Sequence, residues 1–313
     1  MRKRWRRKRK EEWKEGQCEN LLKLLFLGKG GEAYIDLEIL LPYCTLENEP
    51  DLLRETLKSN MIARYSSIFK VSKILLYNSR KMLECKEQKE RLTLYLTFFR
   101  TPPYLRKKIF GKRKELRYSG IAYPLQTPTH TLKSKPQIGE IREGLVLRVK
   151  HGKALVEVGL KAPISVNLDS FEAIEGKTVF LKVSSVSPLK LELTNRPKDW
   201  IGYEIEDAGR LESYLRRIKG ERTVIGTSRK GEPVWENWKK IEESMKKTDR
   251  KVTIVFGEPY RGIYEIAKDL SINTDDFFDG IYNFVKDQGT KTIRTEEAIP
   301  IVLSVIHFIN VHS

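Results

Sequence analysis

The segment QGTKTIRTEEAIPIVLSVIHFINV, residues 288–311, decides the fold, because a polar, glycine-containing loop opens directly onto an apolar helix. Thr295 is expected to be the N-cap, since its hydroxyl can accept a hydrogen bond from an unpaired first-turn N–H. Glu296 and Glu297 then lie where the helix dipole favours carboxylates. Pro300 is early enough in the helix to remove little of its hydrogen bonding. Such a loop can hold a small ligand by backbone groups, although an ordinary capped helix explains the pattern equally well.

Two upstream segments, TVIGTSRKG (223–231) and IVFGEPYRG (254–262), have the same form: a strand ends in a polar loop with glycine. A strand-like piece at 280–285 precedes the C-terminal loop. In a parallel sheet, loops at the carboxyl ends of strands converge where ligands bind. Gly257 and Gly262 alone are weak evidence, because turns at strand ends need glycine anyway. The chain has no Walker lysine motif and no GxGxxG, which argues against nucleotide hydrolysis and a Rossmann site.

Strand and helix patterns alternate in the N-terminal and C-terminal parts of the chain, which favours a parallel α/β sheet. Strands are expected at 33–41, 71–77, 223–226 and 252–256, and helices at 52–69, 81–91, 207–219 and 235–247. Residues 92–99 are ambiguous and can extend the helix at 81–91.

Residues 137–195 read differently, as short alternating strands separated by Gly-rich or Lys-rich turns. The five segments are GEIREGLVLRV, KALVEVGL, APISVNL, KTVFLKVSSV and KLELTN. Five such strands in about sixty residues predict a small barrel of the OB type. Barrels of this type often bind single-stranded nucleic acid, but one can equally serve as a rigid spacer.

The formal net charge is +17, and eight of the positive charges lie in residues 1–10. A strongly basic chain is typical of nucleic-acid binding, because releasing counterions from phosphates drives association. A solvated basic surface is the alternative. Cationic and aromatic side chains interleave from residue 100 to 118, as in surfaces that stack unpaired bases. The predicted RNA contacts, including two in the barrel, are Arg100, Tyr104, Arg106, Lys107, Lys108, Arg113, Arg117, Arg142 and Lys150.

The 313 residues have room for two domains or for one interrupted by an insertion. No apolar run reaches the length of a membrane span. Cys18, Cys44 and Cys85 are odd in number and widely spaced, which predicts neither a disulfide nor a zinc site. The four histidines are scattered, so no metal is expected. A reducing, cytoplasmic location fits these features.

Taken together, the three loop segments resemble the cofactor loops of SPOUT-class RNA methyltransferases. With TPPYLRKKIF (101–110) and YSGIAYPLQTPTH (118–130), residues 35–313 resemble the archaeal and eukaryotic RNA methyltransferase family in which an OB-like barrel interrupts the SPOUT domain. A human centromere-associated SPOUT-domain protein belongs to that family. The resemblance implies an α/β trefoil-knot fold, a homodimer and S-adenosylmethionine as cofactor. The implied organisation is a basic extension (1–32), a first SPOUT part (33–135), the barrel (136–196) and a second SPOUT part (197–313).

The resemblance also implies the residues of the cofactor site. By position these are Gly226, Thr227, Ser228, Arg229, Gly257, Glu258, Gly262, Asn283, Gln288, Gly289, Ile293, Thr295 and Ala298. Methylation of a base nitrogen such as uridine N3 requires loss of its proton, so a base or a cationic partner is needed. We expect Arg64 or Arg229 to place and polarise the target. A helix-start role explains Glu296 and Glu297 better than catalysis does.

The leading expectation is therefore an S-adenosylmethionine-dependent methyltransferase that acts on a uridine base of ribosomal RNA. The alternative is a non-catalytic RNA-binding or assembly protein on the same fold. A DNA-binding protein would need a recognition helix, and the sequence shows no pattern for one.

Overall fold

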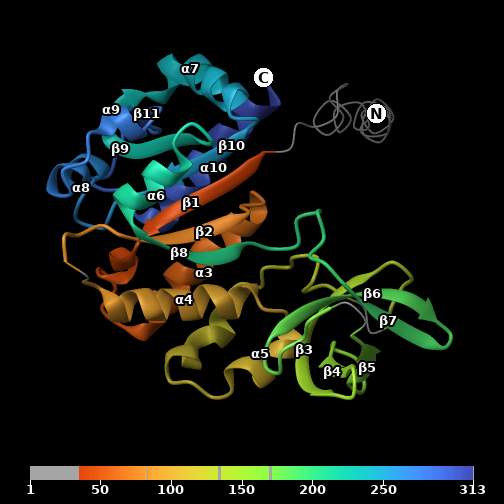
Figure 1. Cartoon of the computed structure of the whole chain (residues 1–313). Helices are drawn as coiled ribbons and strands as arrows, with labels where there is room; N and C mark the ends of the chain where they lie inside the picture. The colour runs from red at the N-terminus through yellow and green to blue at the C-terminus, as the bar shows by residue number, and fades with distance from the viewer. Residues whose placement is uncertain (1–34, 83, 133–134, 169–170, 313) are drawn as a thin grey trace, which may run out of the picture.

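The computed structural model describes residues 35–82, 84–132, 135–168 and 171–312, and it has a mixed α/β fold with two sheets (Figure 1). The first is a six-stranded parallel sheet in the order β11-β9-β10-β1-β2-β8. Its strands are β1 (Asp36–Pro42), β2 (Lys73–Asn78), β8 (Glu204–Arg210), β9 (Thr223–Pro233), β10 (Lys251–Val255) and β11 (Gly280–Asn283). The predicted parallel α/β sheet is thus confirmed.

Helices cover both faces of this sheet, because its strands are apolar on both sides. Side chains at alternate positions of β1 enter different cores: Leu37 and Ile39 pack on one face and Leu40 on the other. The first core is closed by α3 (Leu52–Ile68), α4 (Lys86–Arg100), α7 (Val234–Lys247) and α10 (Thr295–Val311). The second is closed by α6 (Leu211–Ile218) and α8 (Ile263–Asp269).

The second sheet is a five-stranded antiparallel, nearly closed barrel in the order β5-β4-β3-β6-β7 (Figure 1). Its strands are β3 (Ile141–Lys150), β4 (Lys153–Glu157), β5 (Ile164–Asn167), β6 (Thr178–Val186) and β7 (Leu189–Thr194). Alternate side chains such as Val156 and Leu181 fill its separate core. All five strands lie inside the predicted insertion, 136–196, whose boundaries stay a prediction. The extension 1–32 lies outside the described residues.

Short elements join these parts. They are the 3-10 helices η1 (Tyr43–Leu46) and η2 (Glu115–Ile121) and the helices α5 (Pro103–Phe110) and α9 (Thr274–Phe277).

Several expected boundaries differ from the structure. The helix predicted at 81–91 begins only at Lys86 and continues to Arg100, so the ambiguous residues 92–99 are helical. The helix predicted at 207–219 begins only at Leu211, because Glu204–Arg210 pairs with β2 as the edge strand β8. Thr295 is the first residue of α10, and Arg294 precedes it as the N-cap. The Glu297 carboxylate accepts the Arg294 N–H at 2.9 Å, so this acidic side chain closes the helix start.

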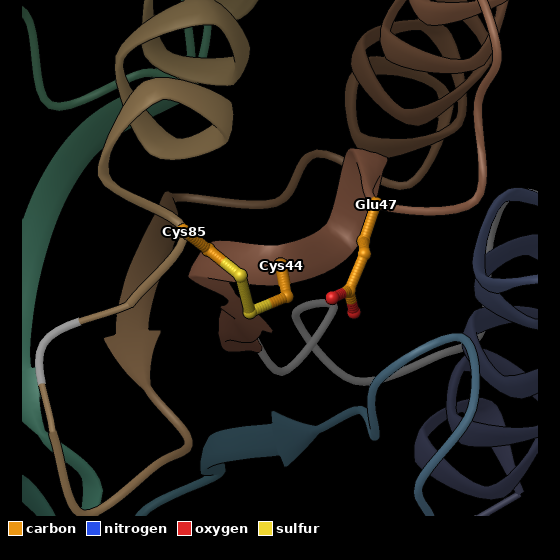
Figure 2. A group of neighbouring side chains, drawn as sticks. All are labelled: Cys44, Glu47 and Cys85. Carbon is orange, nitrogen blue, oxygen red and sulfur yellow. A yellow bond between two sulfur atoms is a disulfide. The ribbon is translucent and has the colours of Figure 1, made fainter.

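Cys44 and Cys85 form a disulfide, so the prediction that the cysteines are unpaired is wrong (Figure 2). The parallel strands β1 and β2 are neighbours with Pro42 opposite Tyr77, so the segments that follow both strands meet at one edge of the sheet. Sequence spacing carries no information about this proximity. Cys18 lies outside the described residues. Within the described ranges, no helix is both long and apolar enough to cross a bilayer.

The disulfide should stabilise the protein measurably, since the bonded cysteines are 41 residues apart in sequence. Closing a loop of that length in the unfolded chain corresponds to roughly 3–4 kcal/mol. We expect a dithiol reductant to lower the free energy of unfolding of the wild type in urea by about that amount. The Cys44→Ala, Cys85→Ala double variant should not respond to reductant. Identical wild-type curves with and without reductant would contradict the prediction.

Candidate functional site

A cavity of about 380 Å³ lies beside residues 227–230 of β9 and beside the segments that follow β10 and β11. The loop predicted at 227–231 lies within β9, as an irregular stretch between Gly226 and Glu232 where the pairing with β11 shifts register. These strands are adjacent in the sheet, so the segments 227–230, 256–262 and 282–298 meet around one space. The volume is in the range of small-molecule sites. Three segments that are far apart in sequence thus form one concave site.

The structure brings together eleven of the thirteen residues expected to bind a cofactor. Those that line the cavity are Thr227, Ser228, Arg229, Gly257, Glu258, Gly262, Asn283, Gln288, Ile293, Thr295 and Ala298. Gly226 and Gly289 do not line it. Sequence reasoning missed the apolar wall of Phe256, Tyr282, Phe284, Ile301 and Val302, and it missed Tyr260 and Lys291. Only their nearness to the glycine loops could have indicated them. The binding role of all these residues stays a prediction.

The expected cofactor-site glycines differ in how closely neighbouring atoms approach the position of a Cβ. A Cβ at Gly257 would lie 2.9 Å from the Arg261 carbonyl oxygen, within a turn that the Glu258 N–H closes by donating to that oxygen at 2.8 Å. Gly257 therefore allows the tight turn itself. A Cβ at Gly226 would meet Ile281 at 2.8 Å, so Gly226 allows β9 to pack against β11. Nothing lies within 4 Å of a Cβ at Gly289.

The Glu258 side chain is fully buried and anchors the second loop to the segment after β2. It accepts a hydrogen bond from Ser79, and the Arg80 guanidinium lies 3.4 Å from it. Arg80 also pairs with Glu47 at 2.7 Å and Glu84 at 2.6 Å. Glu258 thus has a structural role in holding the loop, whatever its contact with a ligand.

Glu47 also belongs to a group of potential metal ligands with Cys44 and Cys85, whose ligand atoms lie within 4.8 Å of one another (Figure 2). Both sulfur atoms are used in the disulfide, and the Glu47 carboxylate is paired with Arg80. In this state the group cannot provide thiolate ligands.

A second buried charge network anchors the C-terminal loop. Lys58 on α3 lies 3.1 Å from Glu49 and 3.6 Å from Glu296. Arg294 reaches both of these carboxylates at 3.3 Å. The polar face of α3 is therefore buried. Residues 294–297 (RTEE) thus anchor the loop and begin α10, which agrees with a helix-start role for Glu296 and Glu297.

Two cations at the cavity have no carboxylate partner within the described part of the chain. The exposed Arg229 donates from Nη1 to the Lys291 carbonyl oxygen at 2.7 Å and so links the first and third loops. The Lys291 ammonium forms no ion pair there either. By contrast, Lys230 pairs with Glu265 at 2.6 Å, and this hydrogen bond lowers the pKa of Glu265. Burial raises the pKa of Tyr282 to about 12, so this phenol stays neutral. The cavity therefore carries a net positive field.

Arg64 does not line the cavity. Its guanidinium donates to the Pro124 carbonyl oxygen at 2.6 Å and fastens the connector to α3. The side chain thus holds two segments together outside the cavity of this chain, and a catalytic role for Arg64 stays a prediction.

Four predicted RNA contacts also have internal roles. Arg100 pairs with Glu143 of the barrel at 2.7 Å, and the Tyr104 hydroxyl donates to the Glu143 carbonyl oxygen at 2.7 Å. Arg106 donates to the Phe99 and Thr101 carbonyl oxygens, and Arg142 is buried beside Glu140. These side chains fasten the barrel and α5, and their assignment to RNA stays a prediction. Lys107, Lys108, Arg113, Arg117 and Lys150 are exposed, and Lys108 pairs with Glu157.

Residues 36–306 match the model of a family described as "Putative RNA methyltransferase". The chain belongs to this RNA methyltransferase family. It is 30% identical over 281 residues to an uncharacterised protein of Halobacterium salinarum, with 83% of this chain and 95% of that protein covered.

Eukaryotic relatives have a named activity. The chain is 28% identical to the 28S rRNA (uridine-N(3))-methyltransferases of Homo sapiens and Mus musculus. The matches cover 86% of this chain, with 77% of the human protein and 75% of the mouse protein.

The anchor of the second loop can be tested by Arg80→Leu. Removing the guanidinium leaves the buried Glu258 carboxylate without its closest cation, which should cost about 3 kcal/mol in the free energy of unfolding. Arg54→Leu is the matched control, because its pair with Asp51 is exposed and screened by solvent, so its loss should cost much less. Urea unfolding of both variants gives the comparison. Equal losses would show that the Arg80 network does not hold this loop.

Proposed function

We propose that this methyltransferase transfers a methyl group from S-adenosylmethionine to N3 of a uridine in ribosomal RNA. The observation that carries the proposal is the cavity in which the irregular stretch 227–230 of β9 meets the segments 256–262 and 282–298. Family membership supports the reaction class, and the names of the eukaryotic relatives support the substrate.

The residues present fit the proposed donor. Its adenine would be held against apolar side chains of the cavity, namely Phe256, Ile293 and Val302, with backbone groups of the lining segments around its polar edge. Its carboxylate suits the positive field near Arg229 and Lys291. When bound, the donor supplies a methyl group on a positively charged sulfur. No protein metal ligand is needed for such a transfer.

The target uridine needs two things from the protein. Its N3 must be aligned, because alignment alone contributes much of the rate in group transfer. The N3 proton must also leave, to solvent water at the open side of the cavity, and a nearby cation stabilises the resulting negative charge on the base until the methyl group bonds to N3. Arg229 is the residue we assign to this second role, since it lines the cavity and forms no ion pair among the described residues.

We further propose that the parallel domain is a SPOUT domain with a trefoil knot. The strand order β11-β9-β10-β1-β2 supports this, because the segments that would form the knot are the same segments that line the cavity.

A homodimer is supported by exposed Trp235 and Trp238 on α7 and Phe308 and Val311 on the neighbouring α10, since monomers rarely expose such apolar groups together. A cytoplasmic location stays a prediction from the sequence.

The reaction is tested by incubating the full chain with ribosomal RNA and S-adenosylmethionine carrying a tritiated methyl group. We expect radioactivity in the RNA and 3-methyluridine in its nucleoside digest by mass spectrometry. Donor binding without transfer would favour a non-catalytic RNA-binding or assembly protein. Methylation of another nucleoside would correct the substrate.

The donor site is tested by a matched pair of glycine variants. Gly257→Ala should weaken S-adenosylmethionine binding at least tenfold, because its Cβ would press on the Arg261 backbone and open the turn. Gly289→Ala should stay within twofold of the wild type, since its Cβ meets no atom. Calorimetry measures both affinities. Equal affinities in the two variants would remove the second loop from the donor site.

An RNA surface is proposed along the exposed end of α5 and the turn that follows it. Lys112, Arg113 and Lys114 are exposed and have no ion-pair partner among the described residues. Replacing all three by alanine should reduce the slope of log affinity against log salt by up to about three, because about one counterion is released per phosphate contact. The control replaces three exposed cations on and beside α6, namely Arg216, Arg217 and Lys219. An unchanged slope in the first variant would contradict the proposal.

A further inference from the structure

Tyr260 is the exposed aromatic residue of the candidate site. It lines the cavity, yet 73% of it is accessible to solvent. Tyr282, which also lines the cavity, is 1% accessible. Among the described residues, Tyr260 has no hydrogen-bonding, ionic or ring partner. It therefore lies at the rim of the cavity with its ring available to a ligand.

The turn that carries Tyr260 is fixed on both sides. Glu258 is buried against Ser79 and Arg80, and its N–H donates to the Arg261 carbonyl oxygen at 2.8 Å. The Arg261 guanidinium pairs with Asp269 of α8 at 3.1 Å. The ring is thus presented from a braced turn, so binding would cost little ordering of the backbone.

We propose that Tyr260 is the stacking platform for the unpaired target base, a role that rests on the proposed function. An enzyme that modifies a base inside folded RNA must take it out of its stack, and the extruded base then needs an aromatic face. An RNA strand can reach the rim, whereas a small donor is held deeper, between the loops. Arg229 and Lys291 line the same cavity without carboxylate partners, so the positive field of the cavity also favours the approach of an RNA strand.

The test compares Tyr260→Ala with Tyr260→Phe, because phenylalanine keeps the ring and removes only the hydroxyl. Tyr123→Ala is the control for loss of an exposed tyrosine outside the cavity. Three quantities are measured on the full chain: S-adenosylmethionine affinity by calorimetry, affinity for a fluorescent uridine decamer by anisotropy, and kcat/KM for methylation of ribosomal RNA.

We expect Tyr260→Ala to weaken decamer binding and lower kcat/KM by about 5- to 150-fold, the loss typical of one stacked base. Donor affinity should stay within twofold in every variant. Tyr260→Phe and Tyr123→Ala should resemble the wild type in all three measurements.

Three results would overturn the inference. They are wild-type decamer affinity in Tyr260→Ala, an equal loss in Tyr260→Phe, and a loss confined to donor binding, which would assign the ring to the donor. The decamer measurement does not require methyl transfer. If the wild type methylates no RNA but Tyr260→Ala still loses decamer affinity, the proposed function fails and the stacking role stands.

Discussion

Parallel pairing of β1 with β10 is the constraint on which the rest of the structure depends. The pairing runs from Asp36 opposite Lys251 to Leu40 opposite Val255 and joins the N-terminal and C-terminal parts across the inserted barrel. It also places β10 between β1 and β9, so that β10, β9 and β11 lie side by side. Because all these strands are parallel, their following loops lie at one edge of the sheet. The cavity is a consequence of this order.

Buried charges then hold the loops that the sheet has brought together. Glu258 is fixed by Arg80, and the C-terminal loop is fixed through Arg294 by Glu49, which also pairs with Lys58. Such pairs are a weak source of net stability, because removing charges from water is costly. Their value here is positional: each carboxylate has few geometries that satisfy it. A methyl transfer that depends on alignment benefits from loops with one conformation.

The segments that line the cavity and the strands of the barrel were predictable from the sequence. Glycine-containing loops after apolar strands identified the three segments, and alternation of apolar residues identified the barrel strands, because both patterns are local. The partners of individual side chains were not predictable. The internal partners of Arg142 and Arg106 are Glu140 and the Phe99 carbonyl oxygen, and no local sequence pattern indicates either contact. The contact of Cys44 with Cys85 likewise depends on the pairing of β1 with β2. Tyr260 was missed because exposure is a tertiary property.

The most direct measurement is a crystal structure of the full chain with S-adenosylmethionine bound. The account predicts donor density in the cavity, in contact with all three segments: 227–230, 256–262 and 282–298. Donor density elsewhere on the molecule, or contact with only one of the three segments, would contradict the claim that the converging loops form the donor site.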